Sequence, residues 1–265
     1  MTFSFNVMGN MGHLGNQMFQ YAFLMGISDK YSTDYIIPPK DHFGSNYNLR
    51  SSIYDAFDIT AKPGISKYRQ VREPHFHFSE SLFNNLPENI DIDFWGFFQT
   101  EKWFKHIENK VRKEYTFKEH IQAEAKQLRD SIRGECISIH IRGTDYVKLE
   151  AHTSLTQKYY TSALSYLPKD LPLIVFTDDV KWVEDQKLIH DREYLVCDYD
   201  DPYIDMCVMS MCDYHIIANS SYSWWGSWLS NSKMTIAPRK WFGGKLLRHN
   251  IKDIHCSDWK ILDII

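Results

Sequence analysis

The chain has 265 residues, enough for one large domain or two smaller ones with a sizeable core. Hydrophobic residues make up 43% and charged residues 24%, which excludes a mostly disordered chain. The 30 basic and 34 acidic side chains give a net charge of -4, which excludes a basic nucleic-acid-binding module.

The predicted elements alternate along the chain. In the first half we expect strands at 3–8, 34–37 and 93–98, and helices at 15–30, 101–113 and 120–132. Residues 40–89 are polar and poorly periodic, so we expect irregular structure there. In the second half we expect strands at 136–141, 173–176, 215–218 and 234–237, and helices at 155–167, 203–211 and 222–229. Strands that alternate with helices predict an α/β fold with mainly parallel sheets, whose ligands bind at the carboxyl ends of the strands.

Two features bear on the compartment. Residues 2–28 and 214–232 carry no charge, but polar residues and glycines interrupt both, and no basic residue precedes the first, so we expect neither to be a signal peptide or to span a membrane. The cysteines are scattered, odd in number and without a CxxC pair, which predicts reduced thiols in the cytoplasm and no zinc site. They are Cys136, Cys197, Cys207, Cys212 and Cys256.

A glycine-containing loop follows the first predicted strand. Gly9, Gly12 and Gly15 have the spacing GxxGxxG, which differs from the GxGxxG of dinucleotide-binding proteins. The glycines allow a tight turn, and the helix after them offers unpaired N–H groups to a ligand. An ordinary turn between strand and helix is the alternative.

The strand at 136–141 is followed by an arginine. His140 and Arg142 alternate with Ile139 and Ile141, so both point to the same side of the strand. An arginine at the end of a strand can hold a phosphate through its planar fork. A hydrogen-bonded core histidine is the alternative for His140.

Carboxylates follow the next strand. Asp178 and Asp179 could accept hydrogen bonds from a guanine edge or a sugar hydroxyl, or could cap the next helix. A second acidic cluster predicts a solvated turn before a helix rather than a metal site. That cluster consists of Asp198, Asp200, Asp201 and Asp205.

Small polar side chains precede the Trp-rich helix. Asn219, Ser220, Ser221 and Ser223 could form an anion site together with the N–H groups of the helix start. Ordinary capping of the helix, with the tryptophans packed in the core, is the alternative.

Taken together, these stretches resemble the glycosyltransferase family 11 α-1,2-fucosyltransferases of bacterial type. The matching stretches are GHLGNQMFQYA at 12–22, GFFQTEKWF at 96–104, HIRGTDY at 140–146, FTDD at 176–179 and MSMCDYHIIANSSYSWWGSWL at 209–229. They occur in the family's order and extend over most of the chain.

The resemblance implies an α/β, GT-B-like fold with two facing Rossmann-type domains and mainly parallel sheets. Residues 1–132 would form the acceptor-side domain and residues 133–265 the GDP-fucose-binding domain. The implied reaction is the inverting transfer of L-fucose from GDP-β-L-fucose to O2 of a terminal β-galactoside, without a cofactor or metal. Such a reaction belongs to surface glycan or O-antigen biosynthesis in the cytoplasm.

The resemblance also implies roles for single residues. Arg142 would neutralise the diphosphate, and Asp145 would be the general base or would orient Arg142. His140 and Asp178 would contact the guanine and the ribose. The residues expected to bind GDP-fucose are Gly15, Asn16, Gln17, His140, Arg142, Asp178, Asn219, Ser220, Ser221 and Ser223.

One departure concerns the central motif. The family's motif usually reads HxRRGD, and here Gly143 stands where a second arginine is expected, while Thr144 is similar to the RRTD of α-1,6-fucosyltransferases. Basic residues in 233–252 are expected to compensate. The alternatives for this segment are a solvated face or contact with the anionic inner membrane surface, helped by Trp241 and Phe242.

Three other functions are weighed against the first. A different acceptor sugar or linkage would keep GDP-fucose as the donor. A glycan-binding or GDP-sugar-binding protein with weakened catalysis is suggested by the missing arginine. A nicotinamide-dependent oxidoreductase is disfavoured by the glycine spacing.

Overall fold

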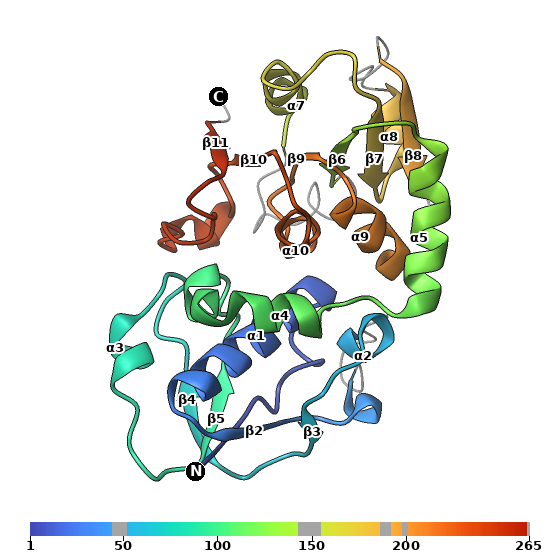
Figure 1. The fold of residues 1–265 in the computed structure, drawn as a ribbon. Coiled ribbons are helices and arrows are strands. Elements are labelled where there is room, and N and C mark those ends of the chain that lie inside the picture. Colours follow the sequence, from blue (N-terminus) through green and yellow to red (C-terminus); the bar gives the residue numbers. More distant parts are fainter. Residues whose placement is uncertain (44–51, 143–154, 186–191, 198–200, 264–265) are drawn as a thin grey trace. The chain divides into compact units, whose positions relative to one another are not determined.

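The computed structural model describes residues 1–43, 52–142, 155–185, 192–197 and 201–263. The chain divides into two compact units, drawn in Figure 1. Unit 1 comprises Met1–Lys118 and Asn250–Cys256, and unit 2 comprises Glu119–His249 and Ser257–Ile265. Each unit has its own sheet.

Unit 1 contains a five-stranded parallel sheet in the order β3-β2-β1-β5-β4. Its strands are β1 (Thr2–Ser4), β2 (Asp34–Ile37), β3 (Lys62–Pro63), β4 (Arg69–Arg72) and β5 (Ile92–Trp95). Its helices are α1 (Leu14–Lys30), α2 (Ile53–Ala56), α3 (Glu80–Asn84) and α4 (Glu108–Glu114), with 3₁₀ turns at Lys40–His42, Glu101–Trp103 and Lys105–Ile107. The strand order reverses between β1 and β5, which is where sheets of this kind bind ligands.

The core of unit 1 is aromatic. Phe23 on α1 stacks on Phe98 with ring centroids 3.6 Å apart and meets Phe94 edge to face at 4.9 Å. Most of α1 is buried, because it packs among other elements on several sides, and this accounts for the absence of charge in residues 2–28. Among the described residues, no helix is long and apolar enough to cross a membrane.

Unit 2 contains a six-stranded parallel sheet in the order β11-β10-β9-β6-β7-β8. Its strands are β6 (Ile137–Ile141), β7 (Leu173–Thr177), β8 (Tyr194–Cys197), β9 (Tyr214–Ile216), β10 (Met234–Pro238) and β11 (Lys260–Leu262). Its helices are α5 (Glu119–Ser131), α7 (Gln157–Leu164), α8 (Val180–Asp185), α9 (Pro202–Ser210) and α10 (Ser221–Leu229), with a 3₁₀ turn at Gly244–Arg248. This is the doubly wound order, with its reversal between β6 and β9.

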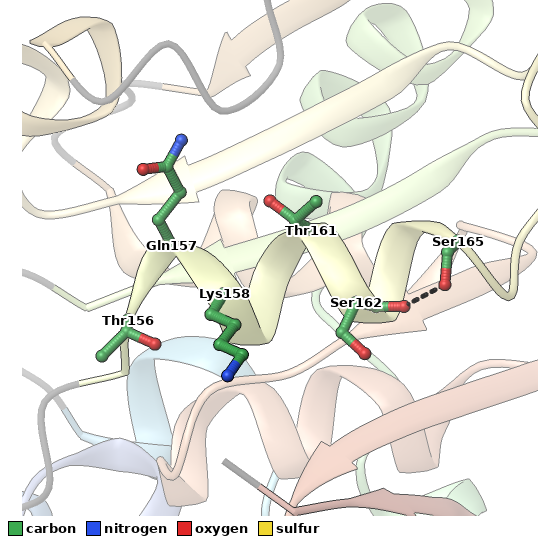
Figure 2. A pocket seen from close by; sticks show the side chains of 6 residues that line it. All are labelled: Thr156, Gln157, Lys158, Thr161, Ser162 and Ser165. Carbon is green, nitrogen blue, oxygen red and sulfur yellow. Dashed lines mark hydrogen bonds between the residues drawn. The ribbon is translucent and has the colours of Figure 1, made fainter. Parts of the chain in front are cut away.

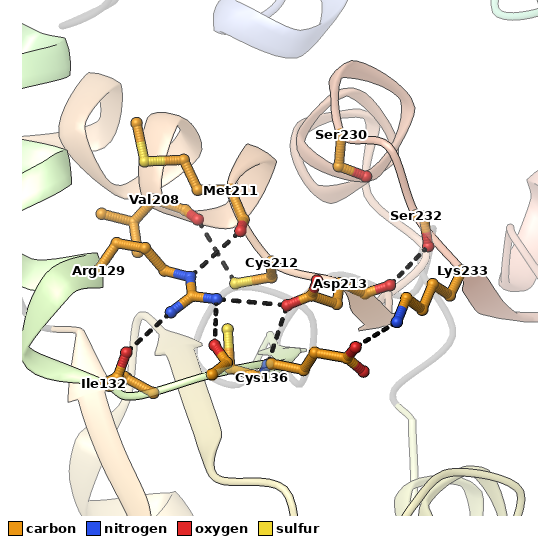
Figure 3. Close-up of polar contacts among 12 residues, drawn as sticks. Arg129, Ile132, Cys136, Val208, Met211, Cys212, Asp213, Ser230, Ser232 and Lys233 are labelled. Carbon is orange, nitrogen blue, oxygen red and sulfur yellow. Dashed lines mark hydrogen bonds and ion pairs between the residues drawn. The ribbon is translucent and has the colours of Figure 1, made fainter.

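The first helix of unit 2 is anchored by Arg129, as Figure 3 shows. Its guanidinium donates to the carbonyl oxygens of Met211 at 3.2 Å and Gly134 at 2.7 Å, and its Nη2 lies 3.3 Å from Asp213. Asp213 also accepts from the N–H of Cys136 at 3.0 Å. These contacts tie the end of α5 to the segments that precede β6 and β9.

The observed division therefore differs from the expected boundary at 132. Unit 1 ends at Lys118, because α5 packs against α9 of unit 2. The segment Asn250–Cys256 returns to unit 1, where Asp253 accepts from the N–H of Phe78 at 3.1 Å and from Lys102 Nζ at 2.7 Å. The five cysteines are buried free thiols.

Four expectations for the first half need correction. The strand expected at 3–8 is β1, which ends at Ser4, because the chain enters turns from residue 6 onward. Residues 40–89 are not irregular throughout, because β3, β4, α2 and α3 lie there; each has at most five residues, too few to show a period. The strand expected at 93–98 ends at Trp95, since the chain turns through Phe98 at φ +53°. The helix expected at 101–113 consists of two 3₁₀ turns followed by α4.

Candidate functional site

In unit 2, the predicted residues gather at the carboxyl ends of β6, β7 and β9. His140 is the fourth residue of β6, and Arg142 follows that strand directly. Asp178 follows β7, the neighbour of β6 on one side. Asn219 and Ser220 follow β9, its neighbour on the other side, and lead into α10. The predicted group therefore surrounds the point where the strand order reverses.

His140 is buried, with 5% of its surface exposed. Burial lowers its pKa to about 3, Arg142 acts in the same direction, and Asp178 opposes the shift. Its imidazole is therefore neutral at pH 7, and its ring lies 5.8 Å from that of Tyr222. Nδ1 is buried and has no hydrogen-bond partner among the described residues, which is uncommon for a buried polar atom and marks this edge of the ring as unsatisfied.

The hydrogen-bonded core histidine of this sheet is a different residue. His215 on β9 is fully buried, with Nδ1 2.6 Å from Ser138 Oγ and Nε2 2.9 Å from Ser230 Oγ. Burial lowers its pKa to about 3 as well. The alternative considered for His140 thus describes His215.

Arg142 and Asp178 form an ion pair across the adjacent ends of β6 and β7. The distance from Nε to Oδ2 is 3.6 Å, and the two side chains are 30% and 29% exposed. The pair is accessible to solvent, so it can be reached by a charged ligand. Its geometry orients the guanidinium at the carboxyl edge of the sheet.

The polar side chains before α10 divide into different roles. Ser220 is the N-cap and accepts from the N–H of Tyr222 at 3.3 Å. Asn219 donates Nδ2 to the carbonyl of Trp241 at 2.9 Å. Ser223 is fully buried, and its hydroxyl lies 3.4 Å from the carbonyl oxygens of Ala218 and Ser220.

Ser221, the first residue of α10, is half-buried. The expected cluster is therefore not a uniform anion site. Ser223 and Asn219 brace the turn, while the helix start with Ser220 and Ser221 provides the N–H groups that attract an anion.

In unit 1, the predicted residues open α1. Gly12 has φ +92°, which permits the turn before the helix. Gly15 and Gln17 are buried and Asn16 is half-buried. Gln17 lies with Nε2 3.4 Å from the carbonyl of Gly12, and its Oε1 accepts from the N–H of Ile53 at 3.1 Å. Gln17 thus braces the loop against α2, which leaves Asn16 as the more accessible of the two polar side chains.

Two glutamines that sequence reasoning did not assign connect the loops after β1 and β5. Gln99 donates Nε2 to Asn16 Oδ1 at 2.6 Å. Gln20 donates Nε2 to the carbonyl oxygens of Met11 at 3.1 Å and Gly96 at 3.2 Å. Both glutamines lie inside stretches that carry the family resemblance, so the sequence marked them without giving a role.

A third unassigned residue is Glu73, directly after β4. Its carboxylate accepts from the N–H groups of Phe97 at 2.7 Å and Phe98 at 3.0 Å. Burial raises its pKa to about 7, although these two hydrogen bonds act in the opposite direction. It lies in the stretch expected to be irregular, where no pattern drew attention to it.

Several expectations fall on other parts of the chain. Gly143, Thr144, Asp145, Asp198 and Asp200 lie outside the described residues. Within the described ranges, no group of three or more His, Cys, Asp or Glu side chains is placed to hold a metal ion.

Asp201 confirms the expected turn before a helix. Its Oδ1 accepts from the N–H groups of Tyr203 at 2.7 Å and Ile204 at 3.4 Å, so it caps the start of α9.

The basic segment at 233–252 is less free than expected. Lys233 is paired with Glu135, and Arg239 with Asp263. Trp241 and Phe242 are only 3% and 8% exposed, so the two aromatic anchors expected to help membrane contact are part of the core.

A hollow runs along α7 and is shown in Figure 2. All its lining residues belong to this helix or flank it directly, and none comes from the carboxyl edge of the sheet. They are Thr156, Gln157, Lys158, Thr161, Ser162 and Ser165. The hollow is therefore separate from the residues predicted to bind a ligand.

Comparison with known proteins gives a family and a fold. The model of glycosyl transferase family 11 matches residues 2–263. An α-1,2-colitosyltransferase of Escherichia coli is 31% identical over 87% of this chain and 90% of that protein. The O-antigen biosynthesis glycosyltransferase WbnK of E. coli is 30% identical over 88% of this chain and 93% of that protein.

Solved structures share the architecture. The fucosyltransferase NodZ from Bradyrhizobium aligns with a TM-score of 0.54 and 12% identity, over 86% of this chain and 93% of NodZ. A NodZ α-1,6-fucosyltransferase structure soaked with GDP-fucose aligns with a TM-score of 0.53 and 13% identity, over 86% of this chain and 92% of that one. The expected α/β class of GT-B type with mainly parallel sheets is confirmed.

Proposed function

The chain belongs to glycosyl transferase family 11, and on that premise we propose that it is a galactoside 2-α-L-fucosyltransferase. It transfers L-fucose from GDP-β-L-fucose to O2 of a terminal β-galactoside, inverts the anomeric carbon and needs no metal ion. The reaction takes place in the cytoplasm, during assembly of a surface glycan such as O-antigen.

The observation that carries this proposal is the arrangement at the carboxyl edge of the unit 2 sheet. A neutral, buried imidazole, a partly exposed guanidinium and a helix start meet where the strand order reverses. A nucleoside diphosphate offers hydrogen-bonding base edges and a diphosphate, which match these groups. The GDP-fucose-soaked NodZ structure, which has the same fold, supports the same donor.

The chemical step moves charge onto the departing nucleotide. The bond between C1 of fucose and the β-phosphate oxygen breaks, and its electron pair leaves with GDP. O2 of the galactoside then bonds to C1 from the opposite face and gives up its proton. Arg142 and the N–H groups at the start of α10 stabilise the negative charge that develops on the diphosphate.

His140 and Asp178 orient the nucleotide. Because His140 is neutral, it can donate or accept a hydrogen bond without adding charge beside Arg142. Asp178 pairs with the guanidinium, and its partly exposed carboxylate can accept from a ribose hydroxyl. Asn16, which the resemblance placed among the residues that bind GDP-fucose, lies in unit 1, the part of the chain expected to bind the acceptor, and it is therefore assigned to the acceptor side. Asp145 is the candidate for the base that takes the proton from O2.

The test is a transfer assay with GDP-fucose and a panel of acceptors that includes lactose and N-acetyllactosamine, with and without EDTA. We expect GDP release and a 2-linked fucosyl product that survives the chelator. A product with another linkage would overturn the proposed regiochemistry. Binding of GDP-fucose without transfer to any acceptor would favour the glycan-binding alternative instead.

A second donor is favoured by one observation. The E. coli relative at 31% identity is named an α-1,2-colitosyltransferase, and colitose is L-fucose without its 3-hydroxyl. The same assay with the colitose donor decides between the two sugars. A higher kcat/KM for colitose would replace fucose in the proposal and leave the family assignment intact.

A further inference from the structure

Glu73 connects the end of β4 to the turn that follows β5. Its N–H donates to the carbonyl of Trp95 at 2.8 Å, which extends the pairing of the two strands by one residue. Beyond Trp95, the N–H groups of the chain after β5 donate to the carboxylate of Glu73 rather than to a backbone carbonyl. Oε2 accepts from Phe97 N–H at 2.7 Å and Oε1 accepts from Phe98 N–H at 3.0 Å. One side chain thus satisfies two consecutive N–H groups.

The turn that Glu73 holds has an unusual backbone. Phe98 has φ +53°, a left-handed conformation that disfavours side chains larger than glycine by roughly 1–2 kcal/mol. A Cβ on Gly96 would approach Glu73 Cβ at 2.4 Å, so the glutamate packs directly against the glycine backbone. The conformation is kept because Phe98 is buried against Phe23 and because Glu73 binds the two N–H groups.

The same turn places Gln99 next to the residues that follow β1. Gln99 is 7% exposed, and its Nε2 donates to Asn16 Oδ1 at 2.6 Å. Asn16 Nδ2 lies beside Gly12, where an added Cβ would approach it at 2.2 Å. Hence the orientation of the Asn16 amide depends on where the Gly96–Gln99 turn holds Gln99.

The charged groups on the neighbouring strands are engaged elsewhere. Arg72 on β4 lies over the Trp95 ring at 4.9 Å and donates Nε to Gln70 at 2.9 Å. Asp93 on β5 accepts from Ser4 Oγ at 3.1 Å and from Asn6 N–H at 2.8 Å. The remaining ionisable group on β4 is the exposed Arg69. From α1, the group that reaches the turn is the neutral amide of Gln20.

The pKa of Glu73 is therefore set by burial and by hydrogen bonds from two backbone N–H groups. Burial raises the pKa of its carboxyl group to about 7, and the two hydrogen bonds limit the rise. Protonation places a hydrogen on one of the two carboxyl oxygens and removes the charge, which weakens both as acceptors for the N–H groups. The carboxylate form therefore holds the turn more tightly than the protonated form.

We propose that Glu73 is a positioning residue for glycosyl transfer: its carboxylate holds the Gly96–Gln99 turn so that Gln99 fixes the amide of Asn16. This role rests on the proposed function, which assigns Asn16 to the acceptor side. Glu73 acts through Gln99 and does not itself contact a substrate. Loss of the carboxylate releases Asn16 and slows transfer without weakening the donor site in unit 2.

The test compares Glu73→Gln with Asp253→Asn. Both replace a partly or fully buried carboxylate that accepts from backbone N–H in unit 1, but Asp253 binds Phe78 N–H and Lys102, whereas Glu73 binds the amides of the turn. We expect Glu73→Gln to lower kcat on the order of tenfold to a hundredfold, with the KM for donor within about twofold of wild type. We expect the wild-type kcat to fall as the pH decreases through about 7. This acid limb of the pH–rate profile should be absent from Glu73→Gln.

A second readout does not depend on transfer. Hydrogen exchange of the Phe97 and Phe98 amides, compared at one pH, is expected to be faster in Glu73→Gln than in wild type and unchanged in Asp253→Asn. The double variant Glu73→Gln with Gln99→Ala is expected to be no slower than Gln99→Ala alone, because both act through Asn16.

Unchanged exchange together with an unchanged pH limb in Glu73→Gln would overturn the positioning role. An additive double variant would show that Glu73 acts by another route and would overturn it too. If the wild-type enzyme transfers no sugar, the proposed function fails, whereas the amide exchange still tells whether Glu73 holds the turn.

Discussion

Nε of Arg142 lies 3.6 Å from Oδ2 of Asp178, and the two residues follow neighbouring parallel strands. At this distance the carboxylate attracts the guanidinium, whose five N–H donors lie in one plane, and favours one orientation of that plane. The pair therefore places a cation in a partly exposed position at the sheet edge.

The first prediction concerns the planar shape of that cation. Arg142→Lys keeps the charge and removes the fork that can bind two phosphate oxygens. We expect kcat with GDP-fucose to fall on the order of a hundredfold, since one lost donor to a developing charge typically costs that much. Arg133→Lys is the control, because Arg133 is an exposed arginine of the same unit that lies outside the basic segment at 233–252. Equal rates for the two variants would exclude Arg142 from the chemical step.

The second prediction separates orientation from stability. Asp178→Asn removes the charge that holds Arg142, and we expect kcat/KM to fall about tenfold while the melting temperature stays nearly constant. The reason is that an ion pair this exposed contributes roughly 0–1 kcal/mol to the free energy of unfolding. Steady-state kinetics and calorimetry on one preparation check both values. A large loss of melting temperature with unchanged kcat/KM would contradict the assignment.

The buried strands could be predicted from sequence because their apolar residues have few alternatives. β2 matches its expected range, and β6, β7 and β10 differ from theirs by one residue. The expected end of β5 was wrong for a physical reason. Phe97 and Phe98 continue the apolar run, but they pack from a turn whose left-handed residue cannot be read from composition.

The site could be predicted where its signal is local. His140, Arg142 and Asp178 were singled out because polar residues at the ends of buried strands are conspicuous, and the structure places them at the ends of two neighbouring strands. Ser223 was expected to assist the anion site, yet its place one turn into α10 buries its hydroxyl against the backbone. Glu73 was missed because its importance comes from a contact with residues more than 20 positions later in the chain.

The third prediction tests the close fit between Gly12 and Asn16. Gly12→Ala must adopt φ +92° and place a Cβ 2.2 Å from Asn16 Nδ2, so the amide has to move. Gly134→Ala is a matched control, because Gly134 has φ +74° and an added Cβ would meet nothing within 4 Å. We expect each to lose roughly 1–2 kcal/mol of stability from the left-handed backbone, whereas only Gly12→Ala loses transfer activity. Equal transfer rates would mean that Asn16 does not contribute to the reaction.

The fourth prediction is a pH dependence of the free energy of unfolding with opposing contributions. Burial lowers the pKa of His215 from about 6.5 to about 3. Between about pH 3 and about pH 6.5, the unfolded chain therefore binds a proton that the folded chain does not. This stabilising contribution is present above pH about 6.5 and is lost as the pH falls. Glu73 has the opposite sign: its pKa is raised to about 7, so the folded chain holds the extra proton and stability decreases as the pH rises from about 4.5 to 7.

Two substitutions should therefore change the slope of the unfolding free energy against pH in opposite directions. Urea unfolding between about pH 5 and 6.5 measures this slope, and a difference of one bound proton between the folded and unfolded states corresponds to about 1.4 kcal/mol per pH unit. We expect His215→Gln to lower the increase of unfolding free energy with pH, since one proton uptake is removed from the unfolded state. Glu73→Gln should make the increase steeper, because the opposing contribution disappears. If both variants shift the slope in the same direction, the burial of at least one of these two groups does not control its titration.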